Sequence, residues 1–581
     1  MKSVLLFVLF IFGPFGVHAQ SGQEVRPVKR PRPEAPATMP TAPSTRPAVY
    51  KDPAWARPPK LVVGIVVDQM RVDYLYRYWD NFGPGGFKRL VGEGAFLRNV
   101  QYDYAPTHTA PGHASIYTGS TPMHHGIVAN DMWIRSTGTP LYCVQDDAAS
   151  GVGGEGSKGQ RSPNNLLATT ISDELERRTD GRSKTIGVAM KDRSSILPIG
   201  RTGDAAYWFF EGTEGHMATS TWYMTELPQW VKDFNARGLP QQYLKQSWDL
   251  LLPKDRYHQA LPDDNPYEEP LAGTLRPTLP MDVKAMYETA GRSTVPLRFI
   301  PAGNTFTTEF ALAAIAGEEL GQDAVTDLLA ISYGATDELG HEVGPRAVEL
   351  EDMYIRLDLE LARLFDALDS RVGKGAYTVM LTADHAAVDV PAFLRDQQGS
   401  AGYVDVNDLI GRVNAALSAR FGEGEWVVQR IKEQLWMSEE LIKRYGADPA
   451  EVQHVAADAL LSHPMISDAI TASDLARNAY GEGLRRSVQR GFMPMRSGDV
   501  CYVMRPSHLA GYAGMSERGT EHGSPWRYDT HVPVLFMGAG IGHTEVVRTV
   551  SITDLAPTLA MIMGCALPDA TLGSPVPEVL R

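Results

Sequence analysis

The sequence predicts an α/β fold with a mostly parallel central sheet flanked by helices, and three observations support this prediction. Near-continuous runs of β-branched and other apolar residues recur along the chain, as in strands buried on both faces of a parallel sheet. Segments with helical periodicity, such as residues 348–368, lie between these runs. Each run also ends on an ionisable residue. The four predicted strands cover residues 60–68, 185–191, 327–337 and 377–385.

The first 58 residues are predicted to lie outside this fold. Residues 1–19 have the charged start, short apolar run and small-residue end of a secretory signal peptide, with cleavage near Ala19. That run is too short to span a membrane, and no later stretch is apolar enough, so no membrane span is expected. The protein is therefore predicted to be exported, to the periplasm or outside the cell. Residues 20–58 are rich in proline and arginine and are predicted to be a linker.

The composition excludes several classes of protein. The chain of 581 residues has a formal net charge of -14, which disfavours a nucleic acid as partner. Its three cysteines, Cys143, Cys501 and Cys565, are too few for a disulfide framework or a thiolate metal cluster. At most one pair can form, and the sequence leaves the pairing open.

Each of the four predicted strands ends on ionisable residues. These residues are Asp68, Lys191, Asp337 and the adjacent pair Asp384 and His385. Ligands of open α/β sheets bind beyond the carboxyl ends of the strands, so these distant residues are expected to converge on one edge of the sheet. A single strand that ends in aspartate is often only an Asx-turn, but four such endings together indicate a functional site.

Several of these residues are candidate metal ligands. Asp337 and His341 are four residues apart, which lets both side chains reach one ion, and Asp384 and His385 are neighbours. His522 precedes a predicted strand near the end of the chain. Mixed histidine and aspartate ligands without sulfur suit zinc better than magnesium or calcium. With Asp68, six such ligands exceed one tetrahedral site and suggest two zinc ions.

Thr109 is the candidate nucleophile. Pro111 is typical of the first turn of a helix, which places the threonine at or near the N-terminus of that helix. The positive end of the helix dipole favours an alkoxide and a bound anion. An ordinary threonine cap is the structural alternative.

Two insertions into the fold are predicted. Residues 194–315 are rich in aromatic residues and proline, and are expected to form a cap at the rim of the site. Those aromatic side chains could stack on a nucleoside, although packing beneath a cap is the simpler interpretation. Residues 390–515 are expected to form an accessory subdomain with amphipathic helices over residues 406–421 and 428–441.

Taken together, these motifs resemble the alkaline phosphatase superfamily. The chain is most similar to the secreted bacterial zinc phosphomonoesterases with a threonine nucleophile, the phosphate-irrepressible type, and the match spans residues 60–581. The residues that carry the resemblance are Asp68, Thr-Ala-Pro-Gly-His at 109–113, Asn130, Lys191-Asp-Arg193, Asp337 with His341, Asp384-His385, His522-Gly-Ser-Pro and the helix that starts near Ser551. It implies an alkaline phosphatase-like catalytic domain over residues 59–581.

The resemblance also implies a role for each matched residue. Asp68, Thr109, Asp384 and His385 would hold one zinc ion, and Asp337, His341 and His522 would hold the other. Asn130, Lys191 and Arg193 would hold the phosphoryl oxygens. His531 remains the alternative to His522, because both precede the final strand.

The implied activity is hydrolysis of phosphate monoesters through a phosphothreonine on Thr109. Lys191 and Arg193 match the charge of a monoester, which is about -2 near neutral pH, better than the single charge of a diester. A phosphodiesterase, a nucleotide pyrophosphatase or a phosphonate hydrolase of the same superfamily is the enzymatic alternative, and a binding protein that has lost the chemistry is the other. Small phosphate esters are the expected partners, and the protein is expected to be a monomer.

Overall fold

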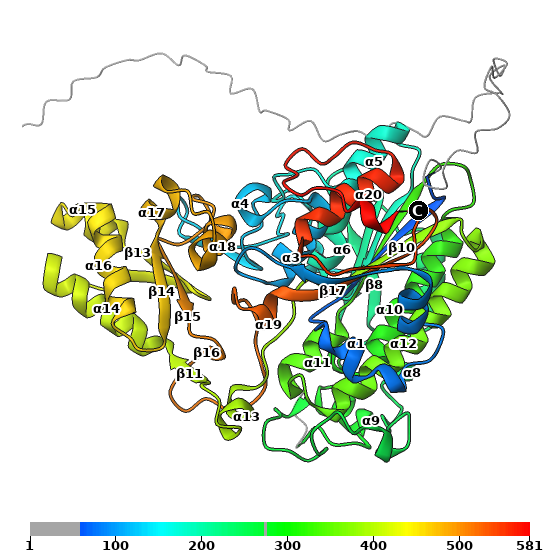
Figure 1. The fold of residues 1–581 in the computed structure, drawn as a ribbon, viewed down its shortest axis with the longest axis horizontal. Coiled ribbons are helices and arrows are strands. Elements are labelled where there is room, and N and C mark those ends of the chain that lie inside the picture. Colours follow the sequence, from blue (N-terminus) through cyan, green and yellow to red (C-terminus); the bar gives the residue numbers. More distant parts are fainter. Residues whose placement is uncertain (1–57, 272–275, 581) are drawn as a thin grey trace, which may run out of the picture. The chain divides into compact units, whose positions relative to one another are not determined.

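The computed structural model describes residues 58–271 and 276–580. The predicted signal peptide, and all of the predicted linker except Pro58, lie outside these residues. Within them, eleven strands form one mixed sheet flanked by helices (Figure 1), which confirms the predicted fold class.

Five parallel strands form the middle of this sheet, in the order β10, β1, β9, β6, β7. Their bounds are β1 Leu61–Val67, β6 Thr185–Ala189, β7 Ala205–Phe210, β9 Asp327–Tyr333 and β10 Tyr377–Thr382. All four predicted strands are present. Each ends one to four residues before the predicted end, so the polar residues lie in the loops and helix starts just beyond the strands.

Antiparallel strands complete both edges. On one side β17 runs antiparallel to β10 and to β2, and β18 and β19 pair parallel with β2. On the other side β8 runs antiparallel to β7 and to β5. Their bounds are β2 Ala95–Gln101, β5 Gly151–Val152, β8 His216–Ser220, β17 His531–Gly538, β18 Thr544–Val546 and β19 Val550–Ser551.

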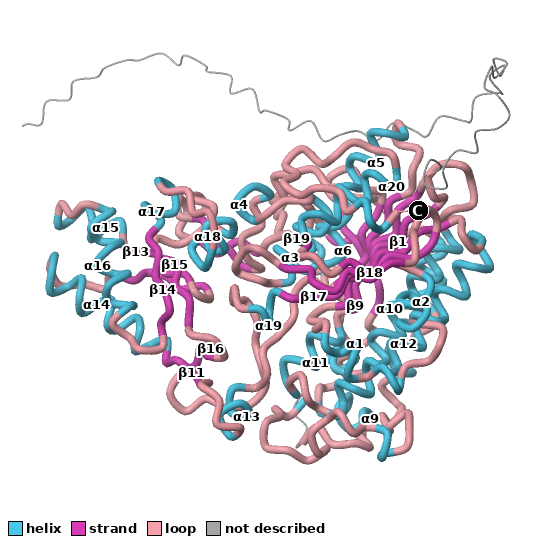
Figure 2. The backbone as a smooth tube through the Cα atoms, viewed as in Figure 1, coloured by secondary structure: helices cyan, strands magenta, loops and turns pink. Residues whose placement is uncertain are grey.

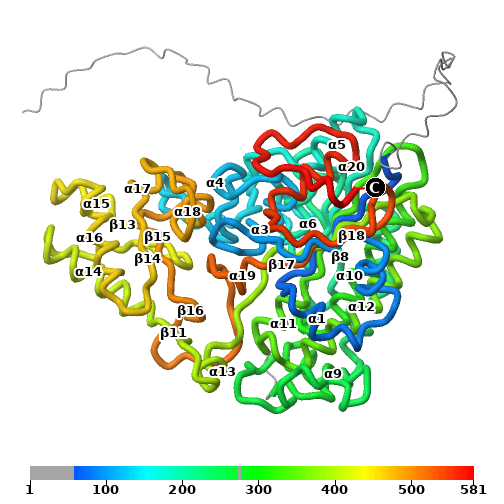
Figure 3. Tube along the Cα trace, viewed as in Figure 1, coloured from blue at the N-terminus to red at the C-terminus, as the bar shows by residue number. Residues whose placement is uncertain are grey.

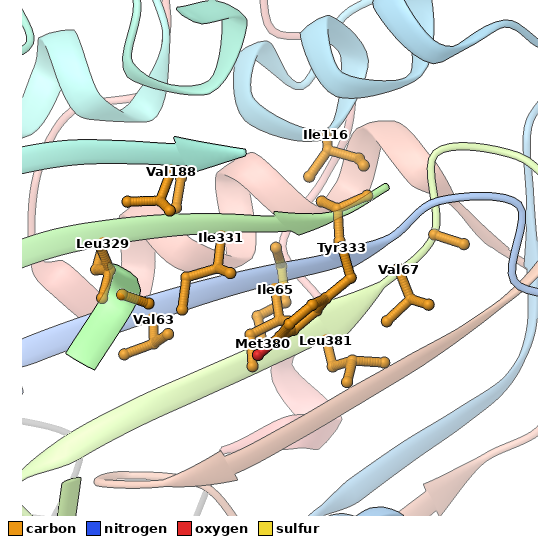
Figure 4. Close-up of a cluster of buried hydrophobic side chains, with 14 of the residues drawn as sticks. Val63, Ile65, Val67, Ile116, Val188, Leu329, Ile331, Tyr333, Met380 and Leu381 are labelled. Carbon is orange, nitrogen blue, oxygen red and sulfur yellow. The ribbon is translucent and has the colours of Figure 1, made fainter. Parts of the chain in front are cut away.

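The core of the sheet is apolar on both faces, which explains the near-continuous apolar strands. All seven residues of β1 are buried. Figure 4 shows side chains of β1 together with those of β9, β10 and β6, and Ile116 of helix α3. Such close packing fixes the strand ends relative to one another. The labelled residues are Val63, Ile65, Val67, Ile116, Val188, Leu329, Ile331, Tyr333, Met380 and Leu381.

Helices cover the two faces of the sheet (Figure 2). Helices α3, α5, α6 and α20 lie on one face, and α10, α11 and α12 lie on the other. Helix α12 has the bounds that the sequence predicted. The helices of this part of the chain are α1 Asp73–Arg77, α2 Phe87–Glu93, α3 Thr109–Thr118, α4 Pro122–His125, α5 Ile171–Thr179, α6 Asp192–Ile199, α7 Gln229–Ala236, α8 Leu239–Tyr243, α9 Val283–Thr289, α10 Pro301–Gly317, α11 Ala335–Val343, α12 Val348–Leu368, α13 Pro391–Asp396, α19 Arg527–Thr530 and α20 Leu555–Met563.

Residues between β10 and β17 build an accessory subdomain with its own apolar core, drawn in yellow to orange in Figure 3. Four described strands form its antiparallel sheet, in the order β12, β13, β15, β14, and β11 pairs with β16. The elements are β11 Gly402–Asp405, α14 Val406–Phe421, β12 Val427–Ile431, β13 Gln434–Met437, α15 Glu439–Tyr445, α16 Pro449–Leu461, β14 Ile466–Thr471, α17 Ala472–Arg477, α18 Gly483–Gly491, β15 Val500–Met504 and β16 His508–Gly511.

The prediction of a helix over residues 428–441 is wrong. These residues form the β12–β13 hairpin followed by the start of α15. Lys432 occupies the turn with φ of 49°, a left-handed conformation that ends any helix and reverses the chain. The helix predicted over residues 406–421 is present as α14.

The segment 194–315 contributes to the main sheet as well as covering it, and in this respect differs from the expected cap. Strands β7 and β8 extend the central sheet, and α10 packs against β9 and β6. The aromatic side chains Trp208, Phe209 and Phe210 are buried in the main core. Their burial agrees with packing rather than with nucleoside stacking. Two strands of a separate hairpin, β3 Asp131–Ile134 and β4 Thr139–Tyr142, lie between α4 and α5 in the chain.

Candidate active site

The parallel strands deliver the predicted residues to one edge of the sheet. Asp68 directly follows β1, and Asp384 and His385 follow β10. Lys191 is the N-cap of α6 after β6, and Asp337 lies in the first turn of α11 after β9. These side chains are buried and interact with one another across more than 100 residues of sequence.

The first cluster consists of Asp68, Asp384 and His385. One potential ligand atom from each lies within 4.8 Å of the others, and all three residues are fully buried. Among the described residues, Asp68 Oδ1, Asp384 Oδ2 and His385 Nε2 have no hydrogen-bond partner. Buried polar atoms nearly always have a hydrogen-bond partner, so three potential ligand atoms that lack one and lie around one point fit a bound cation.

The second cluster surrounds Asp337. His341 Nε2 lies 3.2 Å from Asp337 Oδ1, and His522 Nε2 lies 3.7 Å from the same oxygen. The other ring nitrogen of each histidine is held by a backbone carbonyl, His341 Nδ1 by Thr520 at 2.9 Å and His522 Nδ1 by Thr107 at 2.7 Å. Such bonds fix the ring and direct Nε2 to a metal.

The two clusters adjoin at His385. Its Nε2 groups with Asp337 and His522 as well as with Asp68 and Asp384, and its ring stacks on that of His522 at 3.4 Å between centroids. His531, the alternative to His522, lies elsewhere. It is the first residue of β17, and its Nε2 is hydrogen-bonded to the carbonyl of Arg98 in β2 at 2.9 Å.

Lys191 forms ion pairs with a carboxylate of each cluster. Its Nζ donates to Asp68 Oδ2 at 2.8 Å and to Asp337 Oδ2, and Glu338 Oε1 lies at 3.8 Å. Burial opposes the charge, but Asp337 and Asp68 raise the pKa of Lys191 above its usual value. The lysine therefore stays charged within this acidic site.

The electrostatics of the clusters differ. Burial, together with Asp337 and Asp384, raises the pKa of Asp68 well above its usual value. Asp337 is also buried, yet His341 and Lys191 hold its pKa well below the usual value. In return Asp337 outweighs burial and raises the pKa of His341 to about 10. A dense set of acids and histidines in contact is typical of a functional site.

Thr109 is the first residue of α3, with His108 as the N-cap. The first turn of α3 is tied to the first cluster through His113, whose Nδ1 lies 2.9 Å from Thr109 O and 3.3 Å from Asp384 Oδ2. Asn130 Oδ1 accepts a hydrogen bond from the backbone N–H of Ala110 at 2.9 Å. The structure thus brings Thr109 and Asn130 together at a helix N-terminus, where anions bind.

Arg193 is held in a polar network. Its Nη1 donates to the Tyr142 hydroxyl at 3.0 Å, and that hydroxyl donates to Asp192 Oδ1 at 2.5 Å. Arg161 Nε bonds the other oxygen of Asp192 at 2.7 Å. Arg193 Nε is buried without a hydrogen-bond partner in the described part of the chain, which leaves a charged donor for an anion.

Sequence reasoning assigned no role to several residues of this site. Gln69, 2 % exposed and at φ of 65°, donates from Nε2 to Asp337 Oδ1 at 2.7 Å and from its backbone N–H to Asp384 Oδ1 at 3.3 Å. Glu521 groups with His341 and His522 as a third set of potential ligands. Tyr142 supports Arg193. Only the adjacency of Gln69 to Asp68, and of Glu521 to His522, could have signalled these positions.

Comparison with known proteins decides the family. Residues 62–523 match the family model described as type I phosphodiesterase / nucleotide pyrophosphatase. The chain belongs to this family. The match covers the first and second clusters, Thr109 and the accessory subdomain.

Curated relatives in the family extend over nearly the whole chain. The alkaline phosphatase PafA of Elizabethkingia meningoseptica is 39% identical over 90% of this chain and 94% of its own length. The alkaline phosphatase PhoV of Synechococcus elongatus is 38% identical over 92% of this chain and 95% of its own length. A protein of Myroides odoratus named calcium-transporting ATPase is 41% identical over 90% of this chain and 95% of its own length. None of the described helices is both long and apolar enough to cross a membrane.

A solved structure gives the same result. The crystal structure of PafA aligns with a TM-score of 0.86 at 38% identity, over 90% of this chain and 99% of that one. The chain is therefore an alkaline phosphatase, a hydrolase of phosphate esters. Its described residues include carboxylate and histidine groups that could hold metal ions.

Proposed function

We propose that the protein is a zinc-dependent phosphomonoesterase that acts through a phosphothreonine on Thr109. The observation that carries this proposal is the cluster of orphaned ligand atoms on Asp68, Asp384 and His385, connected through His113 to the first turn of α3. We also propose that residues 1–19 direct export of the protein and that the protein is a monomer.

The donor atoms of the two clusters fit two zinc ions. Asp68, Thr109, Asp384 and His385 would hold one, and Asp337, His341 and His522 would hold the other. Carboxylate and imidazole donors without sulfur suit zinc. When bound, zinc supplies Lewis-acid chemistry, because it lowers the pKa of a hydroxyl and neutralises negative charge.

Thr109 carries the covalent chemistry in this proposal. Its Oγ1 loses a proton and bonds to phosphorus while the bond from phosphorus to the ester oxygen breaks, and the alcohol leaves with a proton. Water then attacks the phosphothreonine, releases inorganic phosphate and returns the proton to Thr109. The N-terminus of α3 favours both the alkoxide and the bound phosphoryl group.

Three further residues are proposed to hold the phosphoryl oxygens. Asn130 already accepts from Ala110 through its oxygen, so its amide N–H₂ group is oriented as the donor. Arg193 has an unpartnered buried Nε, and we infer that Lys191 exchanges its carboxylate partners for phosphoryl oxygens in the working enzyme. Fixed donors of this kind stabilise the charge spread over the equatorial oxygens of the transition state.

A phosphodiesterase is the second candidate, because the family model is described by that activity. The two buried cations Lys191 and Arg193 favour the more negative monoester. The test compares kcat/KM for p-nitrophenyl phosphate and bis(p-nitrophenyl) phosphate with the purified enzyme. The monoester is expected to be preferred by orders of magnitude, and a preference for the diester would replace the proposed function by the alternative.

A further inference from the structure

A cavity of about 250 Å³ adjoins the candidate active site. Its walls come from two parts of the chain: the residues around α3 and His522, and the accessory subdomain. His108 and His522 line it, whereas Thr109, Lys191 and Arg193 are not among its described lining residues. The cavity therefore adjoins the second cluster at His522 and the residue before the candidate nucleophile at His108.

The walls of this cavity are mainly apolar and aromatic. Phe492 follows α18, Tyr502 and Val503 belong to β15, Leu509 belongs to β16, and Trp526 precedes α19. The indole Nε1 of Trp526 is already bonded to Met504 O at 3.0 Å, and the Tyr502 hydroxyl accepts from Arg430 Nε at 3.0 Å. Their polar atoms are thus satisfied, and the rings are left to contact an apolar ligand.

The charges at the rim are arranged in opposite pairs. Lys432, in the turn of the β12–β13 hairpin, bonds Glu521 Oε2 at 3.1 Å, and Glu521 directly precedes His522. Burial raises the pKa of Glu433 above its usual value, although Arg430 and Lys432 oppose this rise. Lys432 therefore has an anion beside it, and the cavity lining carries no excess of basic side chains (Arg430 and Lys432) over acidic ones (Glu433, Glu521 and Asp529).

Two residues that line the cavity, His108 and Asp529, each have a buried polar atom without a hydrogen-bond partner among the described residues. His108 is 2 % exposed, and its Nε2 has no hydrogen-bond partner among the described residues. A Cβ at position 523 would lie 2.6 Å from this nitrogen, so Gly523 keeps the space in front of it open. A ligand with one hydrogen-bonding atom near the metal clusters would satisfy His108.

We propose that this cavity binds the alcohol part of the substrate, and that it selects phosphate monoesters of uncharged, ring-bearing alcohols. The inference rests on the proposed function. In-line displacement places the leaving oxygen opposite Thr109. The second cluster, which shares His522 with the cavity, would hold the metal ion that neutralises this oxygen. The apolar rings bind the ring of the alcohol, and the paired rim charges give no advantage to an anionic alcohol.

The direct test compares benzyl phosphate with ethyl phosphate, since both are esters of primary alcohols and differ mainly in the ring. The expected kcat/KM of the wild-type enzyme is about tenfold or more higher for benzyl phosphate, because a filled apolar pocket discriminates by about that factor. Competitive inhibition by benzylphosphonate and ethylphosphonate should show the same order without any chemical step. Equal values within about twofold in both assays would overturn the proposal.

Two variants locate the effect. Leu509→Trp narrows the cavity and is expected to lower kcat/KM for benzyl phosphate at least about tenfold more than kcat/KM for ethyl phosphate. Phe492→Ala removes one ring of the wall and should reduce the preference for benzyl phosphate. Leu567→Trp is the matched control, because it also replaces leucine by tryptophan but at an exposed position outside the cavity. An equal loss on both esters in Leu509→Trp would show a general structural effect and would contradict the assignment.

A charged analogue tests the statement about the rim. The kcat/KM for 4-carboxybenzyl phosphate is expected to be no higher than that for benzyl phosphate. A kcat/KM about threefold or more higher for 4-carboxybenzyl phosphate would show that Arg430 or Lys432 binds the carboxylate, and would overturn the proposed selection for uncharged alcohols. Failure of the proposed function is distinguishable. In that case no phosphate would be released from either ester or from p-nitrophenyl phosphate.

Discussion

The side-chain amide of Gln69 donates to Asp337 Oδ1 at 2.7 Å, while the backbone N–H of the same residue lies 3.3 Å from Asp384 Oδ1. One residue thus connects a carboxylate of each of the two clusters. Gln69 reaches both because it adopts the left-handed conformation, with φ of 65°, immediately after Asp68. Residues held in this conformation without being glycine are uncommon and often belong to functional sites.

We predict that Gln69→Leu weakens zinc binding and activity by about 10- to 100-fold, as is typical when a residue that orients a metal ligand is removed. Zinc affinity measured by competition with a chelator checks this directly. Gln398→Leu is the matched control, since Gln398 has φ of 62° but is exposed. Unchanged zinc affinity in Gln69→Leu would show that the bond to Asp337 does not position the ligand.

Replacement of the proposed nucleophile should separate chemistry from folding. Thr109→Ala is expected to lower kcat for p-nitrophenyl phosphate by about 10³-fold or more, with the Tm changed little, because only a small buried hydroxyl is lost. Thr137→Ala, on an exposed turn, serves as the control. Wild-type rates in Thr109→Ala would exclude Thr109 as the nucleophile.

The buried cations should affect the two classes of ester unequally. The double variant Lys191→Ala/Arg193→Ala is expected to lose much more kcat/KM on a monoester than on a diester, since the monoester carries the additional negative charge. Steady-state kinetics on p-nitrophenyl phosphate and bis(p-nitrophenyl) phosphate measure both losses. Losses of the same size would remove the charge argument for monoesters.

Tyr142 is expected to act only through Arg193. Tyr142→Phe removes a hydroxyl that accepts from Arg193 and donates to Asp192, and should lower monoester kcat/KM by about tenfold, the usual cost of one bond to a charged group. In an Arg193→Ala background the same substitution should have little further effect. Tyr512→Phe, at a 62% exposed position, is the control. Additive losses would show that Tyr142 acts independently of Arg193.

The strands of this fold are predictable from sequence because β1, β6, β9 and β10 are buried on both faces and therefore read as apolar runs. The convergence of the residues that follow them is a consequence of parallel strand order. The β12–β13 hairpin was not predicted, because short apolar runs suit either a helix or a strand, and the decisive turn at Lys432 has no glycine to mark it.

The site is only partly predictable. Sequence leaves His522 and His531 as alternatives, since both lie near the start of the same apolar run, and only the fold places His522 beside Asp337 and His531 against Arg98. The roles of Gln69 and Tyr142 depend on contacts between distant segments and on one backbone angle. No local pattern encodes these contacts.

The central claim is that two zinc ions lie between these distant side chains, next to Thr109. A crystal structure of the purified enzyme with anomalous data collected at the zinc absorption edge tests it most directly. We predict two zinc peaks about 4 Å apart, one at Asp68, Asp384 and His385 and the other at Asp337, His341 and His522. A single peak, or side chains of either cluster lying far from any zinc in an active preparation, would contradict the account.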